Sequence, residues 1–257
     1  MLQDPPVDVA ALERLVAGTW RGLEEESFGD WLLRAGAGFT GRANSVLVVG
    51  RPPGSFGNAV RAVTDWYQRR GLQPRAQVPL PGAEEADEAF AEAGWTTVED
   101  VLVLTAPLSG WPDAAVAVDL AAEPDDAWLT GYRYRGTPLP PVAREVLMGA
   151  DEPVFTSIRL DPDPAPLAAV ARGAVVEGWL VVTAVTVDDR YRRRGLATAL
   201  MHGLGAWARD RGASACVLQV VETNDPALAL YERLGFTEHH RYHYRLGAEP
   251  AAGPARI

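Results

Sequence analysis

The protein has 257 residues, 47% hydrophobic and 23% charged, which is enough for one large globular domain or two small ones. Its 24 basic residues are all arginines and are outnumbered by 34 acidic residues, so the formal net charge is −10. This charge argues against nucleic acid or an anionic membrane as a partner. Because there is no lysine, no side chain can form a Schiff base or accept an acetyl group on an ε-amine.

Targeting signals and disulfides are not expected. The longest strongly apolar run, Trp179–Val187, is too short to span a bilayer. The first residues, Met-Leu-Gln-Asp-Pro-Pro, contain no basic segment followed by an apolar stretch, so no export signal is predicted. Cys216 is the only cysteine, which excludes an internal disulfide and favours a cytoplasmic location.

Hydrophobic periodicity in the first half of the chain predicts alternating helices and strands. Helices are expected at 7–17, 58–70 and 83–93, and strands at 28–35, 45–49, 73–78 and 95–105. Asn58 is the expected N-cap of the second helix, and Gly71 and Gly94 should end the second and third. Leu108–Asp113, with its glycine and proline, is the best candidate for a domain boundary.

The second half is predicted to be built in the same way. Strands are expected at 115–120, 154–160, 168–172, 175–187, 215–221 and 236–246, and helices at 125–134, 141–148, 196–211 and 226–234. Trp179–Val187 is apolar enough to be a central, buried strand. Asp225 is the expected N-cap of the last helix, with Pro226 at its first position and Gly235 just past its end.

An internal repeat is visible in this order of elements. Helix, glycine, strand, helix, glycine, aromatic residue and strand follow one another in Asn58–Thr105 and again in Leu196–Leu246. The pattern predicts duplication of one α/β unit. We therefore expect domains at 1–110 and 111–248 and a loose tail at 249–257.

The stretch most informative about function is Val185–Thr198, in which a buried strand leads through an arginine-rich turn into a helix. A glycine-containing turn before a helix N-terminus is a good anion site, because backbone N–H groups converge there and the helix dipole adds positive charge. Gly195 would let a ligand approach the backbone closely, and Arg192–Arg194 would supply guanidinium groups for phosphate oxygens. A solvated basic turn or a nucleic-acid patch is the alternative, which this position before a helix disfavours.

Two motifs carry a resemblance to a known superfamily. The first is Arg192-x-x-Gly195-x-Ala197, and the second is Asn224-x-x-Ala227-x-x-x-Tyr231-x-x-x-Gly235-Phe236. Together, in this order, they resemble the signatures of the GCN5-related N-acetyltransferase (GNAT) superfamily. The resemblance implies an α/β (α+β) fold with two GNAT-like domains, each a mixed, mostly antiparallel sheet flanked by helices, of which the N-terminal one is degenerate.

The resemblance also implies roles for individual residues. The acetyl-CoA site, from which CoA leaves as product, would comprise Val185, Thr186, Val187, Arg192, Arg193, Arg194, Gly195, Leu196, Ala197, Thr198, Asn224, Ala227 and Tyr231. In it the strand end would pair with the pantetheine arm and polarise the thioester, and the arginine turn would hold the pyrophosphate. Tyr231 would lie near the sulfur, where it could protonate the leaving thiolate.

The sequence departs from many relatives in the residue that would act as general base. The glutamate that some GNAT enzymes carry on this strand is missing, because Trp179–Val187 contains no carboxylate. Glu177 at the start of this strand and Glu222 just before Asn224 are the remaining candidates. A water relay to a backbone carbonyl is an equal alternative.

The other residues of interest favour structural interpretations. His239 and His243 share a strand face but lie about 13 Å apart, and His240 points the other way, so no metal site is predicted and we expect surface histidines. Cys216 is expected to be an inert core residue. In the first half, the loop Gly50–Gly57 contains two prolines that remove N–H groups an anion would need.

The leading functional hypothesis is an acetyl-CoA-dependent N-acetyltransferase that transfers an acetyl group to a primary amine. A catalytically silent acyl-CoA-binding or regulatory module is the alternative, and a polyanion-binding protein is disfavoured by the charge of −10. The amine acceptor, small molecule or peptide or protein, is not identified by the sequence, and both a monomer and a homodimer are compatible with it.

Overall fold

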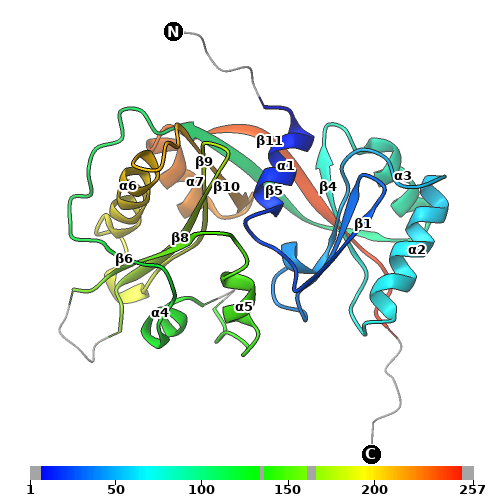
Figure 1. Ribbon diagram of the computed structural model, residues 1–257, viewed down its shortest axis with the longest axis horizontal. Helices are drawn as coiled ribbons and strands as arrows, with labels where there is room; N and C mark the ends of the chain where they lie inside the picture. Colours follow the sequence, from blue (N-terminus) through cyan, green and yellow to red (C-terminus); the bar gives the residue numbers. More distant parts are fainter. Residues whose placement is uncertain (1–6, 134–135, 161–165, 251–257) are drawn as a thin grey trace, which may run out of the picture. The chain divides into compact units, whose positions relative to one another are not determined.

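A computed structural model of the protein describes residues 7–133, 136–160 and 166–250. Its contacts divide these residues into two compact units (Figure 1). Unit 1 contains residues up to 101 and again from 240, and unit 2 contains residues 102–239. The last part of the chain therefore packs with the first part.

Unit 1 is a mixed sheet with helices packed on it. Its elements are α1 (Val9–Ala17), β1 (Glu24–Phe28), β2 (Trp31–Ala35), the 3-10 turn η1 (Arg42–Asn44), β3 (Val46–Leu47), α2 (Phe56–Gln68), β4 (Arg75–Leu80), α3 (Glu84–Glu92), the start of β5 (Thr96–Pro107) and most of β11 (Thr237–Leu246). The strand order is β1-β2-β3-β4-β11, in which only β3 and β4 pair in parallel. Trp31, Val63, Tyr67 and Phe90 lie in its core.

Unit 2 has the same kind of architecture. Its elements are the end of β5, β6 (Asp119–Ala121), α4 (Asp126–Gly131), α5 (Ala143–Leu147), β7 (Pro153–Ile158), β8 (Ala169–Val176), β9 (Trp179–Val187), the 3-10 turn η2 (Asp189–Tyr191), α6 (Leu196–Arg209), β10 (Ala215–Val221), α7 (Asp225–Arg233) and the first residues of β11. The strand order is β5-β10-β9-β8-β7-β6, and β9 and β10 are parallel whereas β6 to β9 are antiparallel. The expected mixed, mostly antiparallel sheet flanked by helices is thus confirmed.

The two faces of the unit 2 sheet are covered by different helices (Figure 1). Leu200 and Leu204 of α6 pack in one core cluster with Ala171 and Leu180 of the sheet. Val154 of β7 belongs to the same cluster, whereas the next residue, Phe155, contacts Trp128 of α4, with ring centroids 5.0 Å apart. Because successive strand residues point to opposite faces, α6 and α4 cover opposite sides of the sheet.

The repeat expected from the sequence is present in the order of elements: α2, β4, α3 and β5 in one half, and α6, β10, α7 and β11 in the other. The glycines that end the four helices, Gly71, Gly94, Gly212 and Gly235, all have positive φ, between 65° and 82°. After the second helix of each half, an aromatic residue donates its N–H to the carbonyl five positions back: Trp95 to Phe90 and Phe236 to Tyr231, both at 3.0 Å. Phe90 is therefore the counterpart of Tyr231.

Several local predictions were wrong. The N-cap of α2 is Ser55 and that of α7 is Asn224, where Asn58 and Asp225 were expected. The strand expected at 28–35 is a hairpin, in which Gly29 at φ 64° separates β1 from β2. The strand expected at 115–120 is reduced to three exposed residues of β6.

Two histidines expected at the surface are buried. The His240 Nε2 atom lies 2.9 Å from a Glu13 carboxylate oxygen of α1, and both residues are buried. The His243 Nε2 atom lies 2.7 Å from the Asp87 carboxylate of α3, which also accepts hydrogen bonds from Arg245. These contacts, together with the antiparallel pairing of β11 and β4, attach the end of the chain to unit 1.

The contact-based units therefore differ from the sequence-based ranges 1–110 and 111–248, chiefly because β11 contributes to both units. Those ranges stay a prediction. Of the expected tail, residues 249 and 250 have no regular structure, and residues 251–257 lie outside the described residues.

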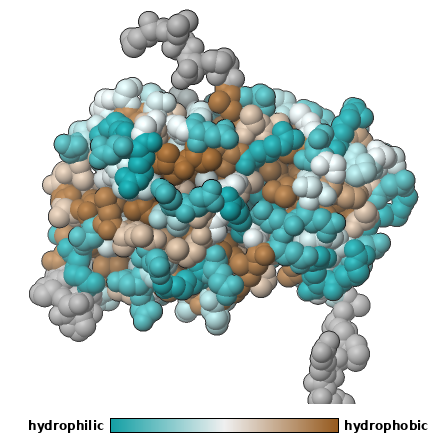
Figure 2. All heavy atoms as spheres, viewed as in Figure 1, coloured by the Kyte–Doolittle hydropathy of each residue, from teal (hydrophilic) through white to brown (hydrophobic). Residues whose placement is uncertain are grey.

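Within residues 7–133, 136–160 and 166–250, no helix has the length and apolar character that crossing a membrane requires. In the same residues, no three histidine, cysteine, aspartate or glutamate side chains are grouped so that they could hold a metal ion. Figure 2 shows hydrophilic residues spread over the viewed face with hydrophobic residues between them.

Candidate functional site

The central parallel strands of unit 2 separate toward their C-terminal ends. The pairing of β9 with β10 runs from Trp179 and Ala215 only as far as Val182 and Leu218. Beyond these residues β9 continues to Val187 and β10 to Val221 without pairing to each other. The edge of β9 that carries Val185–Val187 can therefore offer backbone hydrogen bonds to an extended ligand.

A β-bulge marks the place where the strands separate. The pairing of β8 with β9 shifts between Val170 and Arg172, so that Ala171 faces two residues of β9. One of them, Ala184, has a φ of 58°, which is uncommon for a residue other than glycine. A bulge turns a backbone N–H away from the ladder, which leaves a donor that can point at a ligand oxygen. The sequence did not reveal this feature, because alanine is not a residue that favours positive φ.

The turn after β9 presents several arginines to solvent. Arg192, Arg193 and Arg194 are exposed, and a nitrogen of Arg192 lies 2.5 Å from the Asp189 carboxylate. The guanidinium of Arg194 lies 5.6 Å from the centre of the buried Tyr191 ring, which holds it beside the start of α6. The turn thus carries guanidinium groups that are accessible to an anion.

The N-terminus of α6 is open. Gly195 is its N-cap with φ 77° and, having no side chain, makes no capping hydrogen bond. A Cβ atom placed on Gly195 would meet no protein atom within 4 Å. The first backbone N–H groups of the helix, from Leu196 to Thr198, have no acceptor within the helix. Space, free donors and the helix dipole combine here to suit a phosphate group.

The second motif lies on α7. The Asn224 side-chain oxygen accepts a hydrogen bond from the Ala227 N–H at 3.3 Å, so this residue begins the helix. Tyr231 is buried against Phe236, with ring centroids 5.5 Å apart. Burial, and to a lesser extent the proximity of Cys216, raises the pKa of the Tyr231 hydroxyl. Among the described residues this hydroxyl has no hydrogen-bond partner, so it can donate to a ligand.

The two candidate bases lie at opposite ends of the sheet. Glu222 directly follows β10 at the separated end and is exposed. Glu177 lies in the tight turn that joins β8 to β9, beside Trp179. Val187 is eight residues beyond Trp179, which is roughly 26 Å along a strand. The structure therefore places Glu222, and not Glu177, at the end where Val185–Val187 lie.

Cys216 is fully buried, and burial raises the pKa of its thiol well above the usual range. It packs among the core residues of unit 2. This confirms the prediction of a core residue, and the raised pKa supports the expectation that the thiol is unreactive.

The corresponding place in unit 1 is closed to an anion. The Ser55 hydroxyl accepts a hydrogen bond from the Asn58 N–H and so caps α2. In the loop before α2, the Asp30 carboxylate accepts a hydrogen bond from the Arg51 N–H at 2.8 Å, so this backbone donor is already used and carries a negative charge beside it. No side chain caps α3, and Phe90 stands in place of Tyr231.

The fold, with its separated parallel strands and the open helix N-terminus after them, defines a GNAT-type acetyltransferase. The chain belongs to the family described as "Probable histone acetyltransferase Rv0428c C-terminal", which matches residues 7–245.

Two relatives that match nearly the whole chain carry acetyltransferase names. The probable histone acetyltransferase Rv0428c of Mycobacterium tuberculosis is 34% identical over 95% of the chain and 76% of its own length. The uncharacterized N-acetyltransferase YobR of Bacillus subtilis is 28% identical over 93% of the chain and 98% of its own length. A GCN5-related N-acetyltransferase from Kribbella flavida, 18% identical, has the same fold, with a TM-score of 0.62 over 95% of the chain and 94% of its own.

Proposed function

We propose that the protein is a tandem-domain, acetyl-CoA-dependent N-acetyltransferase that acetylates a primary amine at a single site in unit 2. The observation that carries the proposal is the open, uncapped N-terminus of α6 directly after the separated end of β9. The acetyltransferase names of the relatives support the type of reaction. We also propose a cytoplasmic location, since the single cysteine is a buried thiol.

Different residues of the site would bind different parts of acetyl-CoA. The N–H groups from Leu196 to Thr198 and the exposed guanidinium groups of Arg192–Arg194 would bind the pyrophosphate. The free edge at Val185–Val187 would pair with the amide groups of the pantetheine arm, as another strand would. Asn224 would position α7 beside this arm through its cap. The thioester would then lie near the bulge at Ala184.

Transfer needs three further contributions from the protein. A backbone N–H at the bulge would donate to the thioester oxygen as negative charge develops on it. The amine must lose a proton before it attacks, either to Glu222 or through water to a backbone carbonyl. Tyr231 would donate a hydrogen bond to the departing thiolate; because its pKa is raised, stabilisation of the thiolate by this bond is favoured over complete proton transfer.

The test is release of free CoA thiol from acetyl-CoA, followed with a thiol reagent in the presence of separate amine acceptors. The acceptors are lysine-containing peptides, suggested by the histone acetyltransferase name of one relative, together with peptides with free N-termini and small aliphatic amines. We expect one class to accelerate thiol release over the rate in buffer. Acetyl-CoA binding without acceleration by any acceptor would instead support a silent acyl-CoA-binding module, and absence of binding would refute the proposal.

A further inference from the structure

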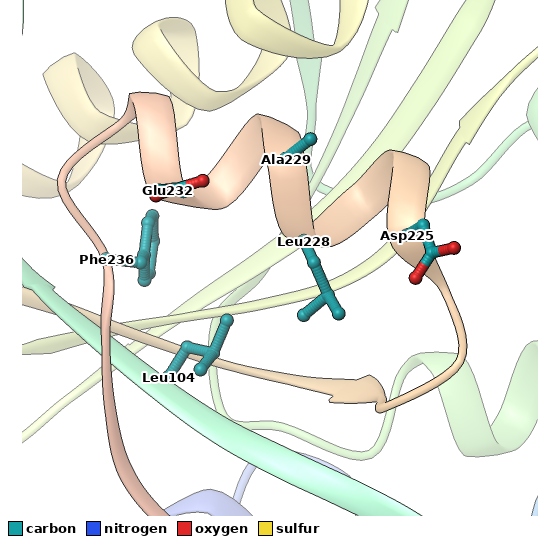
Figure 3. Close-up of a pocket in the computed structure, with 6 residues that line it drawn as sticks. All are labelled: Leu104, Asp225, Leu228, Ala229, Glu232 and Phe236. Carbon is teal, nitrogen blue, oxygen red and sulfur yellow. The ribbon is translucent and has the colours of Figure 1, made fainter.

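A groove runs along one side of α7 in unit 2, and its residues have no part in the acetyl-CoA site proposed above (Figure 3). It is lined by Leu104, Asp225, Leu228, Ala229, Glu232 and Phe236. Its volume is about 320 Å³. The groove is therefore accessible and large enough for a small molecule.

The floor of the groove is apolar. Leu104 of β5 and Leu228 of α7 point toward each other across it, and Phe236 closes one end (Figure 3). Leu104 and Phe236 are largely buried members of the core, so this floor has a fixed shape. Such a surface gains free energy by covering methylene groups, and it offers no hydrogen bonds to a polar ligand.

The two ends of the groove are acidic. Asp225 is the first residue of α7 and Glu232 lies in its last turn, and both side chains are exposed. Seven residues separate them, which corresponds to about 10.5 Å along a helix axis. Figure 3 shows Asp225 and Glu232 at opposite ends with Leu228 between them. This separation is too large for both carboxylates to chelate one metal ion, but it matches a ligand with two separated positive charges.

We propose that this groove binds a linear aliphatic diamine or oligoamine, with one ammonium group at Asp225, another at Glu232, and the methylene chain on Leu104 and Leu228. The net charge of −10 raises the local concentration of such cations. The proposal goes beyond acetyl transfer, because the groove binds the amine whether or not the amine is acetylated.

The experiment is an NMR titration of protein carrying 13C-labelled leucine and alanine methyl groups. The probes are octamethylenediamine and octylamine, which have the same chain length and differ by one ammonium group. We expect the diamine to shift the methyl signals of Leu104, Leu228 and Ala229 and to bind about two- to five-fold more tightly than the monoamine, since each exposed ion pair contributes modestly.

Matched substitutions of single carboxylates test which of them bind the ammonium groups of the diamine. Glu232→Gln and Asp225→Asn should each weaken diamine binding about two- to five-fold. Glu88→Gln, which removes one exposed carboxylate from α3 in unit 1, should leave it unchanged. Glu232→Arg places a cation in the last turn of α7, which a helix tolerates well, and should abolish detectable binding. Acetyl-CoA affinity should stay constant in all four variants, which would show that α7 is intact.

Equal affinity for diamine and monoamine would overturn the proposal, as would shifts in methyl groups away from the groove. An equal loss in Glu88→Gln and Glu232→Gln would mean general attraction to an acidic protein, which also overturns it. Failure of octamethylenediamine as an acetyl acceptor would bear only on the proposed enzymatic function, because binding in the groove is measured without acetyl-CoA.

Discussion

The openness of the α6 N-terminus can be tested with two glycines at opposite ends of the same helix. Gly195 precedes α6 at φ 77°, and Gly212 follows it at φ 81°. At both positions an added Cβ would meet no protein atom within 4 Å. A tryptophan at either position therefore has no clash at its Cβ atom, and the expected cost to stability is that of the left-handed backbone conformation, about 1–2 kcal/mol. The two variants should lose similar amounts of unfolding free energy.

Their effects on acetyl-CoA binding should differ. In Gly195→Trp the indole would occupy the space where the pyrophosphate meets the first N–H groups of α6. A hydrogen bond to a charged group contributes about 1.5–3 kcal/mol, so loss of two such bonds costs about 3–6 kcal/mol. Since about 1.4 kcal/mol corresponds to a tenfold change in affinity, acetyl-CoA should bind at least about 100-fold more weakly. Gly212→Trp should bind it like the unmodified protein.

Isothermal titration calorimetry with acetyl-CoA gives affinity and stoichiometry, and urea unfolding gives stability. We expect one bound acetyl-CoA per chain, because the corresponding helix start in unit 1 is capped by Ser55. The reasoning would be refuted if Gly195→Trp and Gly212→Trp bound acetyl-CoA equally well. Two acetyl-CoA molecules per chain would refute the asymmetry of the two halves.

Two further predictions concern ionisable groups, the buried Tyr231 and the partly buried Asp87. Tyr231→Phe should lower turnover about 10- to 100-fold, since a hydrogen bond to a charged group such as the departing thiolate contributes about 1.5–3 kcal/mol. Acetyl-CoA affinity should stay within a few-fold and the unfolding free energy nearly unchanged, because the hydroxyl has no partner among the described residues. Steady-state kinetics, calorimetry and urea unfolding check this, and normal turnover with lost affinity would contradict it. Burial tends to raise the pKa of Asp87, but hydrogen bonds from Arg245 and His243 outweigh it and lower this pKa. The carboxylate therefore stabilises the fold above its unfolded pKa of about 3.9, and this stabilisation is lost as the pH falls through the lower folded value. The stability difference between the protein and Asp87→Asn in urea unfolding should shrink from pH 7 to pH 3, and a pH-independent difference would be evidence against this.

Prediction from the sequence succeeded where local signals agree with the fold. β10 was predicted with its observed bounds, and Gly195 was correctly placed at the start of α6, because an apolar run and a glycine before helical periodicity are both local features. β1 was missed, since its sequence Glu-Glu-Glu-Ser-Phe has no apolar alternation and its pairing with β2 alone makes it a strand.

Features that depend on residues distant in sequence could not be predicted. His240 is buried because Glu13, more than two hundred positions earlier, lies beside it. The bulge at Ala184 depends on the pairing of β9 with β8 and has no signal in the residue itself. That Glu222 lies at the same end of the sheet as Val185–Val187 depends on the parallel pairing of β10 with β9, which only the sheet topology supplies.

The two halves share an order of elements, so the proposed difference in function rests on a few positions. In unit 1, Ser55 uses a donor of the α2 N-terminus, and the Asp30 carboxylate uses an N–H of the preceding loop. In unit 2, Gly195 leaves the corresponding donors of α6 free. Introducing a hydroxyl into unit 1 by Phe90→Tyr would not by itself create an acyl-CoA site. A hydroxyl at this position has no effect unless the phosphates of the acyl-CoA are also bound. Anion binding at the helix start is the first requirement, and the tyrosine acts only after it is met.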